Sequence, residues 1–322
     1  MNPLKMRYIL IAILALLIFS GGVYLGVYKK DLLTKIPVFP AQKELRLTGY
    51  KYISPILDYE TDNVELKPFQ NEVQAKVDEI QKSGKATDIG VYYRDLNNGP
   101  SFGVNASIQF SPASLLKVPI MISYYVAAET DPGLLSRKLV YNRDPNSKEE
   151  TSLVNGQSYS VDDLISKMII DSDNEAKTTL SSQSGIDFGK PYSDLGVSIP
   201  LVQGLDNNMS VREYASFFRV LFNASYLDKD FSSKALELLT KTKFNDALRA
   251  GVPPNIDVAH KYGERILPND VEQLHDCGIV YVPNHPYLIC IMTRGSDVET
   301  LKSVIRDISQ IVYDKVSGQL QN

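Results

Sequence analysis

Cysteine and histidine are scarce in this chain, and it has no surplus of positive charge. The 322 residues include two cysteines and three histidines, and the formal net charge is −4. The histidines His260, His275 and His285 show no metal-ligand spacing, so we expect no metal site and no cofactor. Without a basic cluster interleaved with aromatics, the composition also argues against nucleic-acid binding. Repeats and low-complexity tracts are absent, and the composition is that of an ordinary globular protein.

The two cysteines lie in one predicted hairpin. Cys277 and Cys290 belong to two apolar runs that flank the sequence Pro-Asn-His-Pro, which is typical of a turn between strands. A turn centred on Pro283 and Asn284 would place the cysteines opposite each other. An oxidising compartment would permit a disulfide, but direct cross-strand pairing strains that bond. A disulfide and two buried free thiols therefore both remain open.

Long uncharged runs are also rare, with one exception near the N-terminus. Tyr8–Tyr28 contains no charged residue. At about 1.5 Å rise per residue, a helix of this length spans the roughly 30 Å hydrocarbon core of a membrane. A cleavable signal peptide is the alternative, but its apolar region would be shorter and would end in small residues. We expect residues 1–30 to be a single-pass membrane anchor, with most of the chain outside the cytoplasm.

The rest of the chain divides into a stalk and one folded domain. Residues 31–66 have no sustained hydrophobic period and contain several prolines, so we expect an extracytoplasmic stalk. From residue 67 to 322 the pattern predicts a helix, a hairpin around residues 97–99, an apolar helix over 114–127 and a mostly helical stretch to about 250. Three strand-like runs follow. A final helix is predicted to begin with a capping box of Ser296 and Glu299.

This order of elements predicts an α+β fold. The strands come from both ends of the domain, so they are expected to form one antiparallel sheet flanked by the N- and C-terminal helices. The helical middle would form a second, all-helical lobe, with a cleft between the lobe and the sheet.

Three short motifs occupy the places where the chain passes between these parts. Ser114 and Lys117 are three residues apart, so they share a face of the predicted helix. The sequence Ser172-Asp-Asn174 lies between two predicted helices, and Lys261-Tyr-Gly lies on the first returning strand. Taken singly, the first two motifs are more typical of a capping serine with a surface lysine and of a helix N-cap than of a catalytic site.

In this order the motifs resemble the Ser-x-x-Lys, Ser-Asp-Asn and Lys-Thr-Gly signatures of penicillin-recognising serine hydrolases, most closely the class A β-lactamases. The resemblance covers roughly residues 68–322. It implies that Ser114 is the nucleophile, Lys117 its base and Ser172 the group that relays a proton to the leaving amine. It also implies that Asn174 holds the amide side chain of the substrate, while Lys261 supplies positive potential for a substrate carboxylate.

The resemblance also implies an oxyanion hole made of two backbone N–H groups, those of Ser114 and Glu264. Gly263 would let the strand approach the substrate closely. The chemistry is consistent, because a serine hydroxyl needs a base. A lysine can act as that base if burial and a second cation, here Lys261, disfavour its ammonium form.

Two features depart from the family pattern. Tyr262 replaces the small hydroxyl residue that normally helps to bind the substrate carboxylate, so either the pocket is reshaped or carboxylate recognition is weakened. The deacylating glutamate of class A enzymes is also missing. No glutamate occurs from Ala176 through Arg212, and the corresponding loop, Leu195–Met209, offers only Gln203 and Asp206 as nearby polar candidates.

These observations predict a membrane-anchored, active-site-serine hydrolase of class A β-lactamase type. It would form an acyl-enzyme with β-lactams or with D-Ala-D-Ala-like peptidoglycan peptides and would be slow to deacylate. The alternative is a non-catalytic binding module of the cell envelope that has kept the fold.

Overall fold

The structure is a computed structural model that describes residues 51–53, 66–97, 99–182, 185–198 and 208–318. The predicted membrane anchor and nearly all of the predicted stalk lie outside these residues, so both stay predictions. Within the described ranges, no helix is both long enough and apolar enough to cross a membrane.

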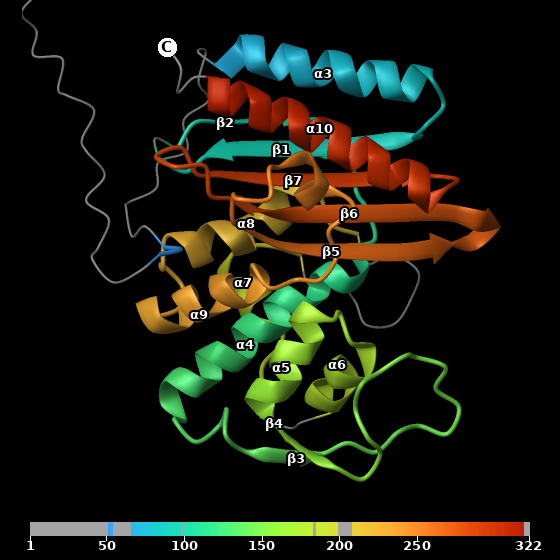
Figure 1. The fold of residues 1–322 in the computed structure, drawn as a ribbon. Coiled ribbons are helices and arrows are strands. Elements are labelled where there is room, and N and C mark those ends of the chain that lie inside the picture. Colours follow the sequence, from blue (N-terminus) through green and yellow to red (C-terminus); the bar gives the residue numbers. More distant parts are fainter. Residues whose placement is uncertain (1–50, 54–65, 98, 183–184, 199–207, 319–322) are drawn as a thin grey trace, which may run out of the picture. The chain divides into compact units, whose positions relative to one another are not determined.

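A five-stranded antiparallel sheet forms the centre of the domain (Figure 1). Its order is β2-β1-β7-β6-β5, and each neighbouring pair is antiparallel. The strands are β1 (Asp88–Asp95), β2 (Ser101–Val104), β5 (Val258–Leu267), β6 (Val271–Val280) and β7 (Tyr287–Gly295). The pairing of β1 with β7 joins the two ends of the domain, which confirms the predicted α+β fold.

The sheet separates two hydrophobic cores. Successive side chains of a strand point to opposite faces, and on β1 Val91 and Tyr93 belong to one core while Tyr92 belongs to the other. The first core lies against α3 (Lys67–Lys82) and α10 (Val298–Gly318), which run side by side in Figure 1. The second core is shared with the helical lobe.

The lobe lies between β2 and β5 in the chain. Its helices are α4 (Lys117–Thr130), α5 (Val161–Ile170), α6 (Asn174–Ser181), α7 (Lys190–Asp194), α8 (Val211–Phe222) and α9 (Lys229–Leu239). It also contains a small antiparallel pair that the sequence pattern does not predict, β3 (Lys138–Val140) and β4 (Ser158–Ser160). The short helices η3 (Leu248–Gly251) and η4 (Pro268–Asp270) lie before and after β5 in the chain.

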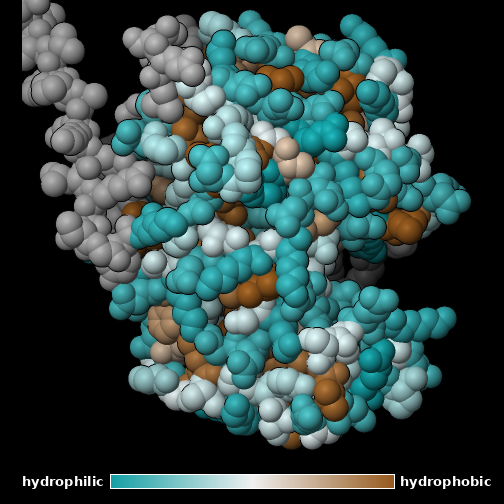
Figure 2. All heavy atoms as spheres, viewed as in Figure 1, coloured by the Kyte–Doolittle hydropathy of each residue, from teal (hydrophilic) through white to brown (hydrophobic). Residues whose placement is uncertain are grey.

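Figure 2 shows a largely hydrophilic surface on which hydrophobic residues are scattered rather than gathered. Among the described residues, the large apolar side chains that remain exposed are Val140, Val154 and Ile266. The apolar residues of the domain are therefore mostly inside the two cores.

Two predicted helix starts are wrong. Ser114 lies in a short 3₁₀ helix, η2 (Ala113–Leu116), and α4 begins only at Lys117. Pro119 accounts for this, because a proline has no N–H to donate to the carbonyl four residues earlier and its ring crowds that carbonyl. The carbonyl of Leu115 instead accepts a hydrogen bond from the hydroxyl of Tyr214, at 3.0 Å.

The predicted capping box of the last helix is the second error. The carboxylate of Asp297, rather than Ser296, accepts a hydrogen bond from the backbone N–H of Thr300, at 2.8 Å. Asp and Ser are equally good N-caps, so neighbouring candidates could not be ranked from the sequence.

The structure answers the question about the cysteines. Cys277 and Cys290 are directly opposite each other on β6 and β7, as the hairpin predicts, and they are joined by a disulfide. Both residues are fully buried. The disulfide therefore links strands β6 and β7 covalently.

Candidate active site

Ser114 and Lys117 lie next to each other, as their spacing predicts. The Nζ atom of Lys117 is 3.0 Å from the Oγ atom of Ser114. The lysine side chain is only 2 % exposed, although it starts helix α4. A surface lysine would be solvated, so this burial excludes the ordinary interpretation of the motif.

The segment that leads into Ser114 is fixed by polar side chains of the sheet. All three hydrogen-bonding groups of Ser111 are engaged: its N–H donates to Gln273 Oε1 at 3.0 Å, its carbonyl lies 2.9 Å from His275 Nε2, and its hydroxyl accepts from Arg265 at 2.7 Å. Buried polar groups need such partners. These contacts hold the start of the nucleophile helix η2 against strands β5 and β6.

The second motif lies in the short turn between α5 and α6. Ser172 has a φ of 55°, in the left-handed region that residues other than glycine rarely adopt. This conformation turns both its carbonyl and its hydroxyl toward Lys117, whose Nζ lies 2.5 Å and 3.1 Å away from them. Asp173 caps α6 through the N–H of Ala176, at 2.9 Å. The motif therefore both caps a helix and faces the lysine.

Asn174 connects Lys117 to a loop that the sequence analysis did not single out. Its Oδ1 accepts from Lys117 Nζ at 2.6 Å, and its Nδ2 donates to the carboxylate of Glu149 at 2.8 Å. The same loop reaches the turn again through Thr151, which donates to Asp173 at 2.6 Å. No sequence signal points to Glu149, because an exposed glutamate in a polar loop is unremarkable.

Lys261 approaches the same serine from the sheet. Its Nζ donates to Ser172 Oγ at 2.9 Å and to the carbonyl of Tyr262 at 3.1 Å, and the residue is fully buried. The hydroxyl of Ser172 thus lies between two lysines, as the resemblance implies for a proton relay.

Burial and a nearby cation weaken the ammonium form of each lysine. Burial, with a smaller contribution from Lys177, lowers the pKa of Lys117 to about 8, against the opposing charges of Asp173 and Glu149. Burial and the nearby charge of Lys117 also lower the pKa of Lys261 well below its usual value. A neutral amine beside Ser114 is therefore accessible near neutral pH, which a general base requires.

Gly263 lets strand β5 approach the nucleophile helix. A Cβ atom at this position would be 2.6 Å from the carbonyl oxygen of Pro112 and 3.1 Å from the backbone nitrogen of Leu115. The backbone of β5 therefore runs beside η2, and Glu264 is the next residue of the strand. The oxyanion hole of Ser114 and Glu264 stays a prediction that this proximity supports.

Tyr262 fills space that a small hydroxyl residue would leave open. Its ring stacks on that of Phe244, with centroids 4.0 Å apart and planes 19° from parallel. Burial raises the pKa of its phenol, and a hydrogen bond with the side chain of Ser172 opposes this shift. The phenol therefore belongs to the site.

A family model described as "Beta-lactamase enzyme family" matches residues 69–316. The chain belongs to this family. The membership confirms the resemblance drawn from the three motifs and places the protein among the serine hydrolases of this family.

Solved structures of similar fold include penicillin-binding and β-lactamase proteins. PBP-A is 21% identical with a TM-score of 0.69, covering 82% of this chain and 99% of its own. A point mutant of PBP-A, an acyl-enzyme complex with penicillin G, is 21% identical with a TM-score of 0.68 over the same shares. A β-lactamase from Chitinophaga pinensis is 20% identical with a TM-score of 0.69, covering 76% of this chain and 99% of its own. No curated protein matches this member of the family.

The loop in which class A β-lactamases carry the deacylating glutamate is only partly described. Gln203 and Asp206 lie outside the described residues, so their roles stay open. Among the residues that are described, no group of three or more His, Cys, Asp or Glu side chains could hold a metal ion.

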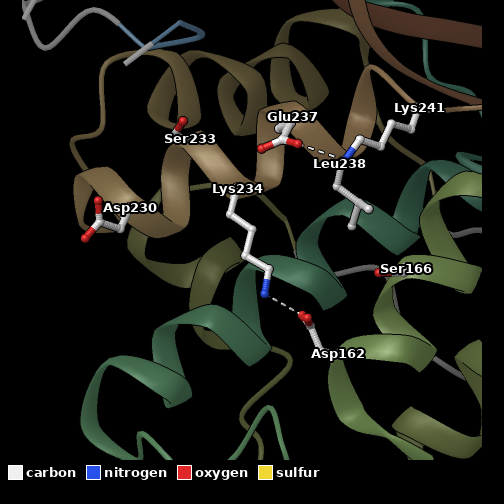
Figure 3. Close-up of a pocket in the computed structure, with 8 residues that line it drawn as sticks. All are labelled: Asp162, Ser166, Asp230, Ser233, Lys234, Glu237, Leu238 and Lys241. Atoms are coloured by element: carbon white, nitrogen blue, oxygen red, sulfur yellow. Dashed lines mark hydrogen bonds and ion pairs between the residues drawn. The ribbon is translucent and has the colours of Figure 1, made fainter. Parts of the chain in front are cut away.

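A hollow opens beside the Ser172 turn of this β-lactamase-family domain. It is lined by Lys148, Glu149, Glu150, Thr151, Ser152, Lys167, Asp171, Ser172, Asp173, Asn174 and Lys243. Another hollow, shown in Figure 3, lies between α5 and α9. In that second hollow Asp162 pairs with Lys234 at 2.6 Å, and Glu237 pairs with Lys241 at 2.8 Å. The first hollow adjoins the motif residues and is the candidate entrance for a substrate.

Proposed function

We propose that the protein is an active-site-serine hydrolase that forms an acyl-enzyme with a β-lactam or a D-Ala-D-Ala-like peptide. The contact that carries this proposal is the 3.0 Å approach of the buried Lys117 amine to the hydroxyl of Ser114. Support also comes from the PBP-A mutant of similar fold, which forms an acyl-enzyme with penicillin G.

The proposed acylation begins with neutral Lys117. It takes the proton of the Ser114 hydroxyl while Oγ bonds to the carbonyl carbon, and the carbonyl electrons move onto oxygen. The backbone N–H groups of Ser114 and Glu264 then stabilise the oxyanion. When the oxyanion collapses, the C–N bond breaks, and the hydroxyl of Ser172 gives its proton to the leaving nitrogen. Ser172 is reprotonated from the lysines that it contacts, at 3.1 Å for Lys117 and 2.9 Å for Lys261.

Covalent labelling tests this assignment. After incubation with a panel of β-lactams and acyl-D-Ala esters, mass spectrometry should find an adduct on the peptide that contains Ser114. Lys117→Ala should slow acylation at least ~10²-fold, the usual scale for a positioned base. An adduct that persists in Ser114→Ala would exclude Ser114 as the nucleophile.

We further propose that deacylation is slow. Hydrolysis of the acyl ester needs a water molecule that is held and deprotonated, and no glutamate is available from Ala176 through Arg212. Loss of a positioned base costs about 10²–10⁴-fold in rate, so a chromogenic cephalosporin should give a burst followed by slow turnover. Rapid turnover without accumulation of the adduct would mean that another residue, with Asp206 the first candidate, supplies the base.

The membrane anchor is likewise a proposal, supported by the uncharged run Tyr8–Tyr28. Intact-mass analysis of membrane-extracted protein should include residues 1–30. A soluble species that starts after residue 30 would instead identify a cleaved signal peptide.

A further inference from the structure

Tyr262 covers the amine of Lys261, the group that is expected to attract a substrate carboxylate. The Nζ atom of Lys261 lies 4.1 Å from the centroid of the Tyr262 ring. Its hydrogen bonds go to Ser172 Oγ and to the carbonyl of Tyr262, at 2.9 Å and 3.1 Å, and the whole residue is 0 % exposed. The Lys261 amine therefore has two hydrogen-bond acceptors within the protein, and an aromatic ring shields it from solvent.

The ring is held in this position from behind. It stacks on Phe244 with centroids 4.0 Å apart, and Lys302 Nζ lies 5.9 Å from the Phe244 ring. Lys302 is itself fixed by Glu299 on the same helix, at 2.7 Å. Displacement of Tyr262 would therefore break its stacking contact with Phe244.

The phenol of Tyr262 also lies close enough to the side chain of Ser172 for that side chain to oppose the rise that burial causes in its pKa. A substrate carboxylate is expected to approach Lys261, and the ring of Tyr262 lies 4.1 Å from that amine. The face of an aromatic ring carries partial negative charge, and an anion buried without partners is strongly disfavoured. A carboxylate beside the scissile bond would therefore meet a ring that repels it.

We propose that Tyr262 makes this site prefer acyl donors that have no free carboxylate next to the scissile bond. In such donors the carboxylate is esterified or continues into a further peptide bond, so the leaving group is neutral. This inference rests on the proposed acylation of Ser114 and narrows its substrate class. Both Tyr262 and Phe244 are partly exposed, so the aromatic pair also offers an apolar surface to such a leaving group.

The test compares two probes that differ only in this charge. Penicillin G and its methyl ester are each incubated with the enzyme, and the second-order rate of Ser114 acylation is measured by intact mass in quenched time courses. The wild type should acylate faster with the ester. In Tyr262→Thr, the acid-to-ester rate ratio should rise at least about tenfold. Both rates come from the same preparation, so any loss of folded protein cancels from the ratio.

Two further variants separate the ring from other effects. Tyr262→Phe keeps the ring and should retain the ratio of the wild type. Tyr313→Thr removes another half-buried tyrosine that packs against the same core, and it should also leave the ratio unchanged.

The outcomes distinguish this inference from the proposal on which it rests. If the wild type prefers the acid as strongly as Tyr262→Thr does, or if Tyr262→Phe shifts the ratio as far as threonine, the inference is wrong while acylation of Ser114 stands. If neither probe gives an adduct on Ser114 in any variant, the proposed function fails and the inference fails with it.

Discussion

Lys117 is surrounded by more acceptors than one ammonium group can serve. Four oxygen atoms lie within 3.1 Å of its Nζ, whereas an ammonium has three protons to donate. Because its pKa is lowered to about 8, roughly one molecule in ten carries the neutral amine at pH 7. We expect the acylation rate to rise about tenfold per pH unit below pH 8 and to level off above it. Stopped-flow acylation from pH 5.5 to 9.5 measures this profile, and a flat profile would exclude Lys117 as the base.

Glu149 adjusts this equilibrium through its charge. It raises the pKa of Lys117 and accepts a hydrogen bond from Asn174. Glu149→Gln keeps an acceptor oxygen but removes the charge that stabilises the Lys117 ammonium, so the pH profile of acylation should move to lower pH. Glu150→Gln makes the same change one residue away and is the control. Equal profiles for the two variants would show that Glu149 has no special coupling to the base.

Ser172 holds its hydroxyl in place at the expense of backbone strain. A left-handed conformation costs a residue other than glycine roughly 1–2 kcal/mol, and Ser172 has a φ of 55°. Ser172→Ala and Ser172→Gly both lose the hydroxyl, and both should be impaired in acylation. Only glycine relieves the strain, so Ser172→Gly should be the more stable of the two by about 1 kcal/mol in urea unfolding. If alanine is as stable as glycine, the strain is not present in solution.

At the scale of the elements, β6 positions the nucleophile through His275. The carbonyl of Ser111 can only accept, so the Nε2 atom 2.9 Å away must carry the proton. The backbone N–H of Thr293 can only donate, so Nδ1, at 3.3 Å, must be the acceptor. The imidazole is therefore neutral, and a second proton would break the bond to Thr293.

Acid should destabilise the fold through this group. Burial, together with the charge of Arg294, lowers the pKa of His275 to about 4, from 6.5 when exposed. The unfolded chain thus binds the proton more readily, and stability is lost as the pH falls through 6.5 toward 4. For this group the loss of unfolding free energy reaches about 3 kcal/mol.

Urea unfolding at pH 7, 6, 5 and 4 measures this loss. The free energy of unfolding should fall more steeply with falling pH in the wild type than in His275→Gln. His285→Gln, which removes a histidine of the hairpin turn, is the control. Parallel curves for the wild type and His275→Gln would contradict this account.

The elements also show how far the sequence could lead. The sheet from both ends of the domain, the register of the cysteine hairpin and the proximity of Ser114 to Lys117 follow from local periodicity and spacing. The meeting of these two residues with Ser172 and Lys261 follows from the resemblance to the β-lactamase family. The contact of Glu149 with Asn174 and the hold of His275 on Ser111 do not. They join residues far apart in the chain, and nothing in a single strand distinguishes a buried histidine with partners from a solvated one. The 3₁₀ helix that contains Ser114 reflects Pro119, a local signal, but the residue that satisfies the Leu115 carbonyl, Tyr214, is distant in the chain.

At the scale of the whole molecule, the site exists only where β5 meets the helical lobe. Gly263 marks this contact, since a Cβ atom there would lie 2.6 Å from the Pro112 carbonyl. Gly251, in η3, marks the opposite side of the domain, since its Cβ would lie 2.6 Å from the Arg306 carbonyl of α10. An alanine substitution at each glycine therefore distinguishes an effect on the acylation rate from an effect on the free energy of unfolding.

Gly263→Ala should push β5 away from η2 and misplace Ser114 relative to its partners. Small displacements of reacting groups are costly, and acylation should slow by about 10–100-fold. Gly251→Ala overpacks η3 against α10 and should lower the free energy of unfolding by about 1–3 kcal/mol, while the folded fraction still acylates at the rate of the wild type. Active-site titration with urea unfolding on both variants measures the two effects. If both variants lose the same acylation rate per folded molecule, the contact at Gly263 has no special part in placing the nucleophile.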